Sequence, residues 1–204
     1  MKPYFQDDAV QIFLGDCREI LPQLPKVDLV LTDPPYPDQH LEYGNCDISF
    51  LGDINCQQLV FWTAKYDFPL SYNAVHIWDK KTGCASEYER IFERNTDRAN
   101  WKVFREYLIN STVAANYCHD VFTGHPSQKP LTLILKMLQY SNCVGLILDP
   151  FMGSGTTLRA AKNLGRKAIG IEIEEKYCEI AAKRMAQTVM NMDSNMKPYY
   201  EDGL

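Results

Sequence analysis

The stretch "LILDPFMGSGTTLRAAKNLGRKAIGIEIE", residues 146–174, joins two apolar strands through a glycine loop and a helix. The first strand ends at Asp149, and the glycines at 153 and 155 open a helix for which Gly165 is the natural C-terminal cap. The second strand ends at Glu172. A strand, a crossover helix and a second strand predict a βαβ unit, and hence a parallel sheet.

Similar segments extend this pattern along the chain. Strands are predicted at 10–16, 27–33, 74–81, 145–150 and 167–173, and helices at 17–24, 127–141, 155–165 and 175–190. Strands that alternate with helices predict an α/β fold, with a mostly parallel sheet covered on both faces. We expect one domain over 1–190, a long mobile loop over 37–73, where turn formers and aromatic residues gather, and a tail over 191–204.

Composition narrows the class of protein. The chain has 204 residues, 46% of them hydrophobic, and no apolar run approaches the ~20 residues of a membrane span. The N-terminus lacks the apolar region of a secretory signal, and the seven scattered cysteines indicate reduced thiols in a cytoplasmic protein. The dispersed histidines and cysteines show no metal-ligand spacing. A net charge of −5 argues against nucleic-acid binding by the whole surface, so the local distribution of charge matters more.

The glycine loop leaves several kinds of site open. A phosphate-binding P-loop needs a lysine where Thr156 stands, and a dinucleotide fingerprint needs a third glycine where Leu158 stands. A nucleoside cofactor without pyrophosphate remains, with Glu172 at the strand end to bind ribose hydroxyls. A tight turn beside a solvated Glu172 is the simple structural alternative.

A second unusual stretch is "VDLVLTDPPY", residues 27–36, where a buried strand ends in an acid, two prolines and an aromatic ring. Alone, it is also typical of a proline-rich turn. Together with "HPSQKP" at 125–130 and "FMGSG" at 151–155, it resembles the S-adenosylmethionine-dependent amino-methyltransferases of DNA. Within that family it is similar to the circularly permuted beta class, in which Asp-Pro-Pro-Tyr precedes Phe-x-Gly-x-Gly. That class usually has Thr where Ser127 stands.

The flanking stretches "GDCREILPQL" and "GIEIEEKYCEIAAKRM" fit the same family, and the resemblance covers about residues 1–36, 74–90 and 122–190. It implies a three-layer Rossmann-like methyltransferase sheet with circularly permuted motif order. It also implies methyl transfer from S-adenosylmethionine to the N6 amino group of an adenine flipped out of double-stranded DNA, typically in restriction-modification. Cytosine N4 is the alternative acceptor, although the cytosine enzymes more often carry Ser at the position of Asp33. RNA or protein-glutamine methylation, and a non-catalytic cofactor-binding module, fit the motifs less well.

The resemblance implies roles for particular residues. Asp33 and the Pro34 carbonyl accept the N–H bonds of the target amino group, Pro35 helps to stiffen this backbone, and Tyr36 stacks on the base. The expected cofactor-binding residues are Asp16, Cys17, Ser127, Gln128, Lys129, Asp149, Phe151, Gly153, Ser154, Gly155, Thr156 and Glu172. Among them, Glu172 is expected at the ribose, Asp16 near the adenine, and Lys129 at the methionine carboxylate.

Recognition of the target is expected in a short insertion at 91–121. Basic residues there and just before it would fall along one face of a helix and follow DNA phosphates; they are Arg90, Arg94, Arg98, Lys102 and Arg105. A solvated helix face is the alternative reading. Tyr43 and Trp62 are candidates for closing over the flipped base, and we expect a homodimer. The segment "MKPYFQDD" at 1–8 reappears as "MKPYYEDG" at 196–203, in the tail that we expect to be disordered.

Overall fold

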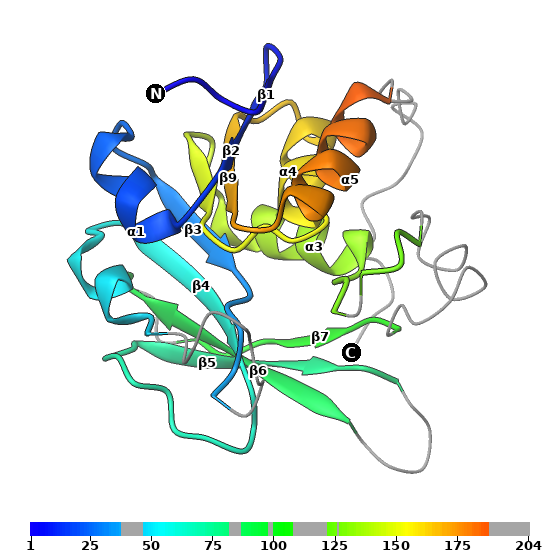
Figure 1. The fold of residues 1–204 in the computed structure, drawn as a ribbon. Coiled ribbons are helices and arrows are strands. Elements are labelled where there is room, and N and C mark those ends of the chain that lie inside the picture. The colour runs from blue at the N-terminus through cyan, green and yellow to red at the C-terminus, as the bar shows by residue number, and fades with distance from the viewer. Residues whose placement is uncertain (38–46, 82–86, 98–99, 108–121, 126, 188–204) are drawn as a thin grey trace.

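The computed structural model describes residues 1–37, 47–81, 87–97, 100–107, 122–125 and 127–187. Its strands form one sheet in the order β1-β2-β9-β8-β3-β4-β6-β5-β7 (Figure 1). The strands are β1 (Phe5–Gln6), β2 (Val10–Leu14), β3 (Leu29–Thr32), β4 (Gln57–Trp62), β5 (Ala74–Asp79), β6 (Tyr88–Arg94), β7 (Val103–Arg105), β8 (Ile147–Asp149) and β9 (Ala168–Glu172). The helices are α1 (Cys17–Ile20), α3 (Leu131–Ser141), α4 (Thr156–Asn163) and α5 (Glu175–Ala186), with short 3₁₀ helices η1 (Leu21–Gln23) and η2 (Ser49–Asp53).

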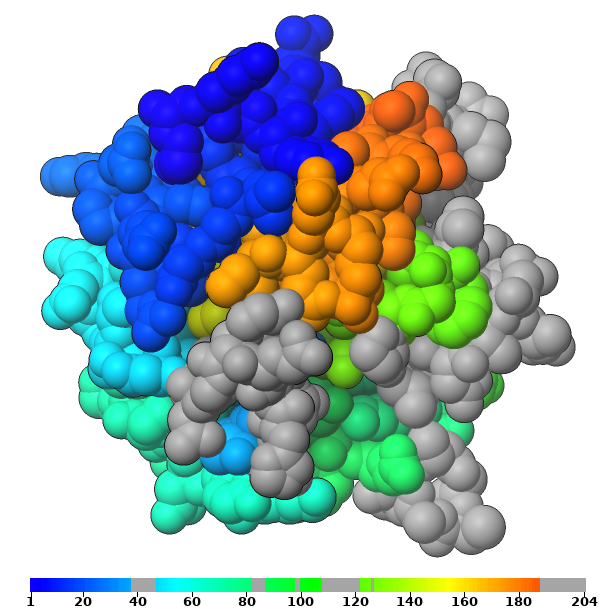
Figure 2. Space-filling model, viewed as in Figure 1, coloured from blue at the N-terminus to red at the C-terminus, as the bar shows by residue number. Residues whose placement is uncertain are grey.

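The sheet is mixed, with a parallel half and a half built mainly from antiparallel pairs. Strands β2, β9, β8, β3 and β4 run parallel, as the βαβ pattern predicted. Strand β6 then pairs antiparallel with both β4 and β5, and β7 returns parallel to β5. The first strands of the chain pair with the last, because β2 lies beside β9 with Val10 opposite Ala168. Figure 2 shows this meeting of the blue N-terminal and orange C-terminal segments on the surface.

Two apolar cores lie on opposite faces of the sheet and make three layers. Helices α3, α4 and α5 cover one face of the sheet (Figure 1), where residues such as Leu133 and Met137 are buried. The other face is covered by α1, η2 and the adjoining loops, which bury Ile20 and Leu51. The predicted α/β fold is therefore confirmed, although the second face carries less helix than the first.

The predicted long loop over 37–73 is wrong in its second part. Residues 57–62 form β4, and all but the first of their side chains are buried. Leu59 and Phe61 face the core beneath the helices, and Val60 and Trp62 face the other core. An apolar run that packs on both faces is typical of an interior strand. Residues 38–46, which include Tyr43, lie outside the described residues.

The predicted basic helix around 90–105 is also wrong. Arg90 and Arg94 lie in β6, and Arg105 lies in β7, so that they do not share a helix face. The Arg94 guanidinium is buried and donates to the carbonyls of Ser71 and Leu51. Arg90 donates to the carbonyls of Thr63 and Tyr66. These two arginines therefore hold loops against the sheet rather than following DNA phosphates, while Arg98 lies outside the described residues.

Smaller differences concern the boundaries and the tail. Helix α3 begins at Leu131 rather than at 127, because Pro130 keeps an extended backbone and forms its N-cap. Within the ranges that the structure describes, no helix is long and apolar enough to cross a membrane. The predicted tail at 191–204, with its repeated segment, is not among the described residues, nor are 108–121 of the predicted insertion.

Candidate active site

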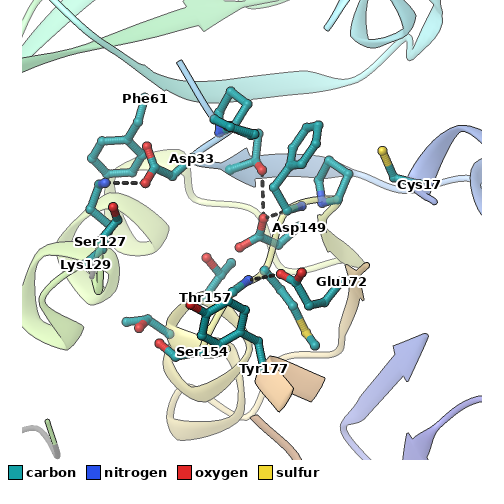
Figure 3. Close-up of a pocket in the computed structure, with 18 of the residues that line it drawn as sticks. Cys17, Asp33, Phe61, Ser127, Lys129, Asp149, Ser154, Thr157, Glu172 and Tyr177 are labelled. Carbon is teal, nitrogen blue, oxygen red and sulfur yellow. Dashed lines mark hydrogen bonds and ion pairs between the residues drawn. The ribbon is translucent and has the colours of Figure 1, made fainter. Parts of the chain in front are cut away.

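The candidate site is a cavity of about 510 Å³ at the carboxyl ends of β2, β9, β8 and β3. Ligands of open α/β sheets bind at this edge. All the residues predicted for the site except Gly155 line the cavity: Asp16, Cys17, Asp33, Pro34, Pro35, Tyr36, Ser127, Gln128, Lys129, Asp149, Phe151, Gly153, Ser154, Thr156 and Glu172. Figure 3 shows Asp33 and Lys129 at one end of this cavity, with Ser154, Glu172 and Tyr177 at the other. The structure thus brings together segments that lie far apart in the sequence.

The glycine-loop end of the cavity is held by backbone N–H groups. Gly153 donates its N–H to Oε2 of Glu172 at 3.0 Å, and Glu174 donates its N–H to Oε1 at 2.9 Å. Burial raises the pKa of Glu172, and these hydrogen bonds oppose the rise. Gly153 has φ +49°, and a Cβ there would lie 3.0 Å from Nε2 of His125. A side chain at Gly153 would therefore crowd the His125 ring, while the Glu172 carboxylate is fixed at the end of β9.

Gly155 serves the packing behind the loop rather than the cavity itself. Its φ is +77°, and it forms the N-cap of α4. A Cβ on this residue would lie 2.9 Å from Cβ of Ala181 in α5. From the same helix, the buried Arg184 donates to the carbonyl of Ser154 at 2.8 Å. Gly155 and Arg184 thus allow α4 and α5 to meet and fix the loop from behind, and Arg184 was not predicted.

Asp149 lies between the two ends of the cavity. Its Oδ1 accepts from Oγ1 of Thr32 at 2.7 Å and from the N–H of Phe151 at 3.2 Å. Burial raises the pKa of Asp149 to about 6, although hydrogen bonds from Thr157, Thr32 and Phe151 act against the rise. Asp149 therefore ties the end of β3 to the glycine loop through one carboxylate.

Asp33 follows β3 directly and has two partners. Tyr36 donates its hydroxyl to Oδ1 of Asp33 at 2.8 Å. Nζ of Lys129 forms an ion pair with Oδ2, as Figure 3 shows. Burial raises the pKa of Asp33; the charge of Lys129 lowers it, and the net direction is upward. Lys129 lies 5.1 Å from the Phe61 ring centroid. The ammonium group was expected at the methionine carboxylate, but in this structure it lies against Asp33.

Tyr36 is supported from behind by β4. Its ring meets that of Trp62 edge-on, with a centroid distance of 5.7 Å and an interplanar angle of 69°. Trp62 is buried and was expected instead in a loop that closes over the base. Pro34 is buried and Pro35 half-buried, and both line the cavity beside Tyr36. The "DPPY" segment is thus packed against the sheet, and Trp62 contributes to its support.

Two other predicted segments shape the walls of the cavity. Asp16 caps α1, because Oδ1 accepts from the N–H of Arg18 at 2.9 Å, and its carboxylate also pairs with the Arg18 guanidinium. Cys17 begins that helix. Gln128 accepts from the N–H of Thr123 at 2.9 Å, which folds the chain before α3. These polar groups are therefore engaged in shaping the loops that enclose the cavity.

Several lining residues were not predicted, and His125, Tyr177 and Glu89 are among them. His125 has its ring centroid 4.4 Å from that of Tyr177, and Nδ1 accepts from the N–H of Ser127 at 3.1 Å. Burial lowers the pKa of His125 to about 4, so the ring is neutral. Glu89 comes from β6 and contacts Tyr36. His125 and Tyr177 lie within stretches quoted for the family resemblance, whereas no local signal marks Glu89.

The arrangement combines two chemical environments in one cavity. One end presents a glycine loop and a fixed carboxylate, which suit a ribose and a polar chain close to the backbone. The other end presents Asp33 and aromatic rings, which suit a planar group with N–H donors. Among the residues that the structure describes, no group of three or more His, Cys, Asp or Glu side chains could hold a metal ion.

Comparisons with known proteins identify the class. The crystal structure of the M1.HpyAVI-SAM complex is 27% identical, covers 86% of this chain and 99% of that chain, and has a TM-score of 0.60. PvuII DNA methyltransferase (cytosine-N4-specific) has a TM-score of 0.69 over 93% of this chain and 90% of that chain, but at 18% identity it shows the fold alone. The fold is thus that of a methyltransferase.

The family follows from the sequence matches. The model of the N6/N4 DNA methylase family matches residues 57–183, so the chain belongs to that family. Type II methyltransferase M.ScaI of Streptomyces caespitosus is 47% identical, with 90% of this chain and 84% of the relative covered. M.HpaI of Haemophilus parainfluenzae is 40% identical, with 82% and 71% covered. The chain spans only 48% of the length of M2.DpnII of Streptococcus pneumoniae, to which it is 35% identical.

Proposed function

We propose that this chain is an S-adenosylmethionine-dependent DNA methyltransferase that methylates the exocyclic N6 amino group of an adenine flipped out of double-stranded DNA. The observation that carries the proposal is the shared cavity, in which Asp33 and the glycine loop line one continuous space. Membership of the DNA methylase family supports the reaction class. In the sequence, "DPPY" precedes "FMGSG", which supports assignment to the permuted beta class.

S-adenosylmethionine fits the glycine-loop end of the cavity. The Glu172 carboxylate is fixed by the N–H groups of Gly153 and Glu174, and both of its oxygens can still accept hydrogen bonds from a ribose. The bare backbone at Gly153 allows a ligand to approach closely. A neighbouring structure of the same fold is an M1.HpyAVI complex with this molecule. When bound, S-adenosylmethionine supplies a methyl group carried on a positively charged sulfur.

The Asp33 end of the cavity fits the amino group of a nucleobase. The lone pair of that nitrogen is conjugated with the ring, so the nitrogen must become pyramidal before it can attack a methyl group. Asp33 and the Pro34 carbonyl would accept its two N–H bonds and favour this change. Tyr36 would offer its ring to the base, which is worth on the order of 1–3 kcal/mol. An amino group inside a duplex cannot reach this cavity, so the base must be flipped out.

The choice of adenine over cytosine rests on Asp33. The resemblance places Ser more often at this position in enzymes that methylate cytosine, so Asp33 favours adenine. Cytosine N4 is the alternative acceptor, and the same chemistry would serve it. Type II methyltransferases among the relatives support a role in restriction-modification. A homodimer and a cytoplasmic location stay predictions.

Methyl transfer to mixed-sequence duplex DNA tests the proposal. The protein is incubated with S-adenosylmethionine labelled in its methyl group, and the DNA is digested to nucleosides. We expect label in N6-methyldeoxyadenosine. Label in N4-methyldeoxycytidine would move the assignment to the alternative acceptor, and DNA that remains unlabelled while RNA or protein is labelled would overturn the proposal.

A further inference from the structure

Four charged side chains, one of them Asp33 itself, form a cluster at the "DPPY" segment. It consists of two carboxylates and two ammonium groups: Asp33, Glu89, Lys80 and Lys129. Lys80 pairs with Oε1 of Glu89 at 2.8 Å, and Lys129 pairs with Oδ2 of Asp33. The positive and negative charges are equal in number, so the cluster is neutral as a whole. Glu89 enters the cavity from β6.

Both oxygens of Asp33 are occupied in this structure. Tyr36 donates to Oδ1 and Lys129 to Oδ2. The proposed function requires Asp33 to accept an N–H bond from the target amino group as well. Each carboxylate oxygen can accept a second hydrogen bond, but the positive charge of Lys129 draws on the carboxylate and makes it a weaker acceptor. Asp33 therefore becomes a better acceptor if Lys129 turns to another partner when the base enters. A buried ammonium group that lost its partner without gaining another would be costly, because burial without a counter-charge is strongly unfavourable.

Glu89 is placed to receive either donor. Its Oε2 lies 3.2 Å from the Tyr36 hydroxyl and 3.4 Å from Nζ of Lys129. Burial alone would raise the pKa of Glu89, but Lys129 and Lys80 outweigh it and the pKa is lowered. Burial and the charges of Asp33 and Glu89 raise the pKa of Tyr36 well above its usual range. Glu89 therefore stays an acceptor, and Tyr36 stays a donor.

We propose that Glu89 is a positioning residue that takes over Lys129 and Tyr36 when the target amino group binds Asp33. The inference rests on the proposed function and names the residue that makes Asp33 available. The exchange forms and breaks only hydrogen bonds and ion pairs. Lys129 keeps its proton, because burial would lower its pKa but the nearby Asp33 and Glu89 outweigh that effect and raise it. Without Glu89, Lys129 would stay on Asp33 and compete with the base.

The test is a double-mutant cycle on the full chain, measured as single-turnover methylation of DNA at saturating S-adenosylmethionine. Glu89→Gln should slow methyl transfer about 10- to 100-fold when Lys129 is present. In a Lys129→Met background, the same change should alter the rate less than about threefold, because only the neutral Tyr36 hydroxyl remains to be moved. Affinity for S-adenosylmethionine, measured by calorimetry, should differ by less than about threefold between Glu89→Gln and the wild type, which separates positioning from cofactor binding.

A matched control is Glu106→Gln. Glu106 also pairs with a lysine, Lys136, and is half-buried, but it does not line the cavity. This variant should methylate DNA at the wild-type rate. Should Glu89→Gln not fold, Glu89→Asp replaces it in the cycle, since it keeps the charge and withdraws the carboxylate from both donors.

The outcomes separate the two proposals. An equal effect of the Glu89 change in both Lys129 backgrounds, or wild-type turnover in Glu89→Gln, would overturn the positioning role and leave the proposed function intact. A wild-type chain that methylates no DNA would overturn the proposed function and this inference together.

Discussion

The two ends of the cavity are built in different ways. At the glycine-loop end, Glu172 is held by the N–H of Gly153, which lies 19 residues away in the sequence. At the other end, Asp33 is held by the side chain of Lys129, 96 residues away, and Tyr36 reaches Glu89 across 53 residues. The first end depends on the backbone of one βαβ unit, whereas the second depends on side chains from distant strands.

This difference predicts different responses to mutation. Backbone donors remain when a side chain is changed, so that variants at the glycine-loop end should lose affinity in proportion to the single contact removed. Charged side chains at the Asp33 end share partners, so that a change to one of them should affect the others.

The largest effect is expected for Asp33→Ala. Removal of a preorganised polar contact to the reacting group should lower methyl transfer about 10²- to 10³-fold. Binding of S-adenosylmethionine should remain, because the glycine-loop end is intact. Single-turnover methylation and calorimetry measure the two quantities, and Asp53→Ala, at an exposed position in η2, is the control. Turnover close to that of the wild type would remove Asp33 from the reaction.

Asp149, between the two ends, should make stability depend on pH. Its pKa in the folded state is raised to about 6, so the folded state holds the proton more tightly than the unfolded chain does. The stability gained by protonation is present below about pH 4 and is lost as the pH rises through about 6. As the pH rises from 4 to 7, the free energy of unfolding of Asp149→Asn should therefore increase by about 3 kcal/mol relative to that of the wild type.

Urea unfolding of both proteins across this pH range measures that difference. The Asn side chain can still accept from Thr32 and Phe151, so the comparison isolates the charge. If the free energies of unfolding of the two proteins differ by the same amount at pH 4 and at pH 7, the pKa of Asp149 is not raised in the folded state.

Glu172→Ala should weaken the binding of S-adenosylmethionine at the glycine-loop end and leave the Asp33 end unchanged. Loss of a charged acceptor costs about 1.5–3 kcal/mol, so the Kd of S-adenosylmethionine should rise about 10- to 100-fold. At saturating S-adenosylmethionine the rate should stay near that of the wild type, unlike the rate of Asp33→Ala. Calorimetry gives the affinity, with Glu175→Ala in the first turn of α5 as the control. Unchanged affinity would refute the assignment of Glu172 to the ribose.

The smallest effect is expected for two matched glycine variants. Gly155→Ala and Gly165→Ala both force alanine into positive φ, at +77° and +65°. A Cβ at Gly155 would meet Ala181, whereas nothing lies within 4 Å of one at Gly165. Gly155→Ala should therefore be the less stable of the two by about 1–3 kcal/mol, as measured by denaturant unfolding. Equal losses would mean that α4 and α5 do not pack tightly through Gly155.

The same contrast explains what the sequence could predict. The strands and helices of 146–174 follow from apolar periodicity and from glycines, which act locally, and the structure has them within a few residues of the predicted bounds. Strand β4 was missed because its apolar run lies among turn formers. Arg90 and Arg94 were interpreted as part of an exposed helix face from their regular spacing. The carbonyls that bind them could not be found from the sequence, because they lie in loops 20 or more residues away.

The candidate site shows the same limit. The residues of "DPPY" and "FMGSG" could be named from the sequence, and the structure places nearly all of them around one cavity. The partners of Asp33 could not be named, because pairing between Lys129, Glu89 and Tyr36 depends on how β3, β6 and α3 are arranged in space. Gly155 was assigned to the cofactor because its motif contains it, whereas its surroundings show a packing role.

The most direct test of the account is a crystal structure of the protein with S-adenosylhomocysteine and a DNA duplex that contains its target. We predict an extruded adenine with N6 within hydrogen-bonding distance of the Asp33 carboxylate and the Pro34 carbonyl, and with the thioether sulfur on the side of the glycine loop. An extruded base whose amino group points away from both oxygens, with Lys129 still paired to Asp33, would contradict it.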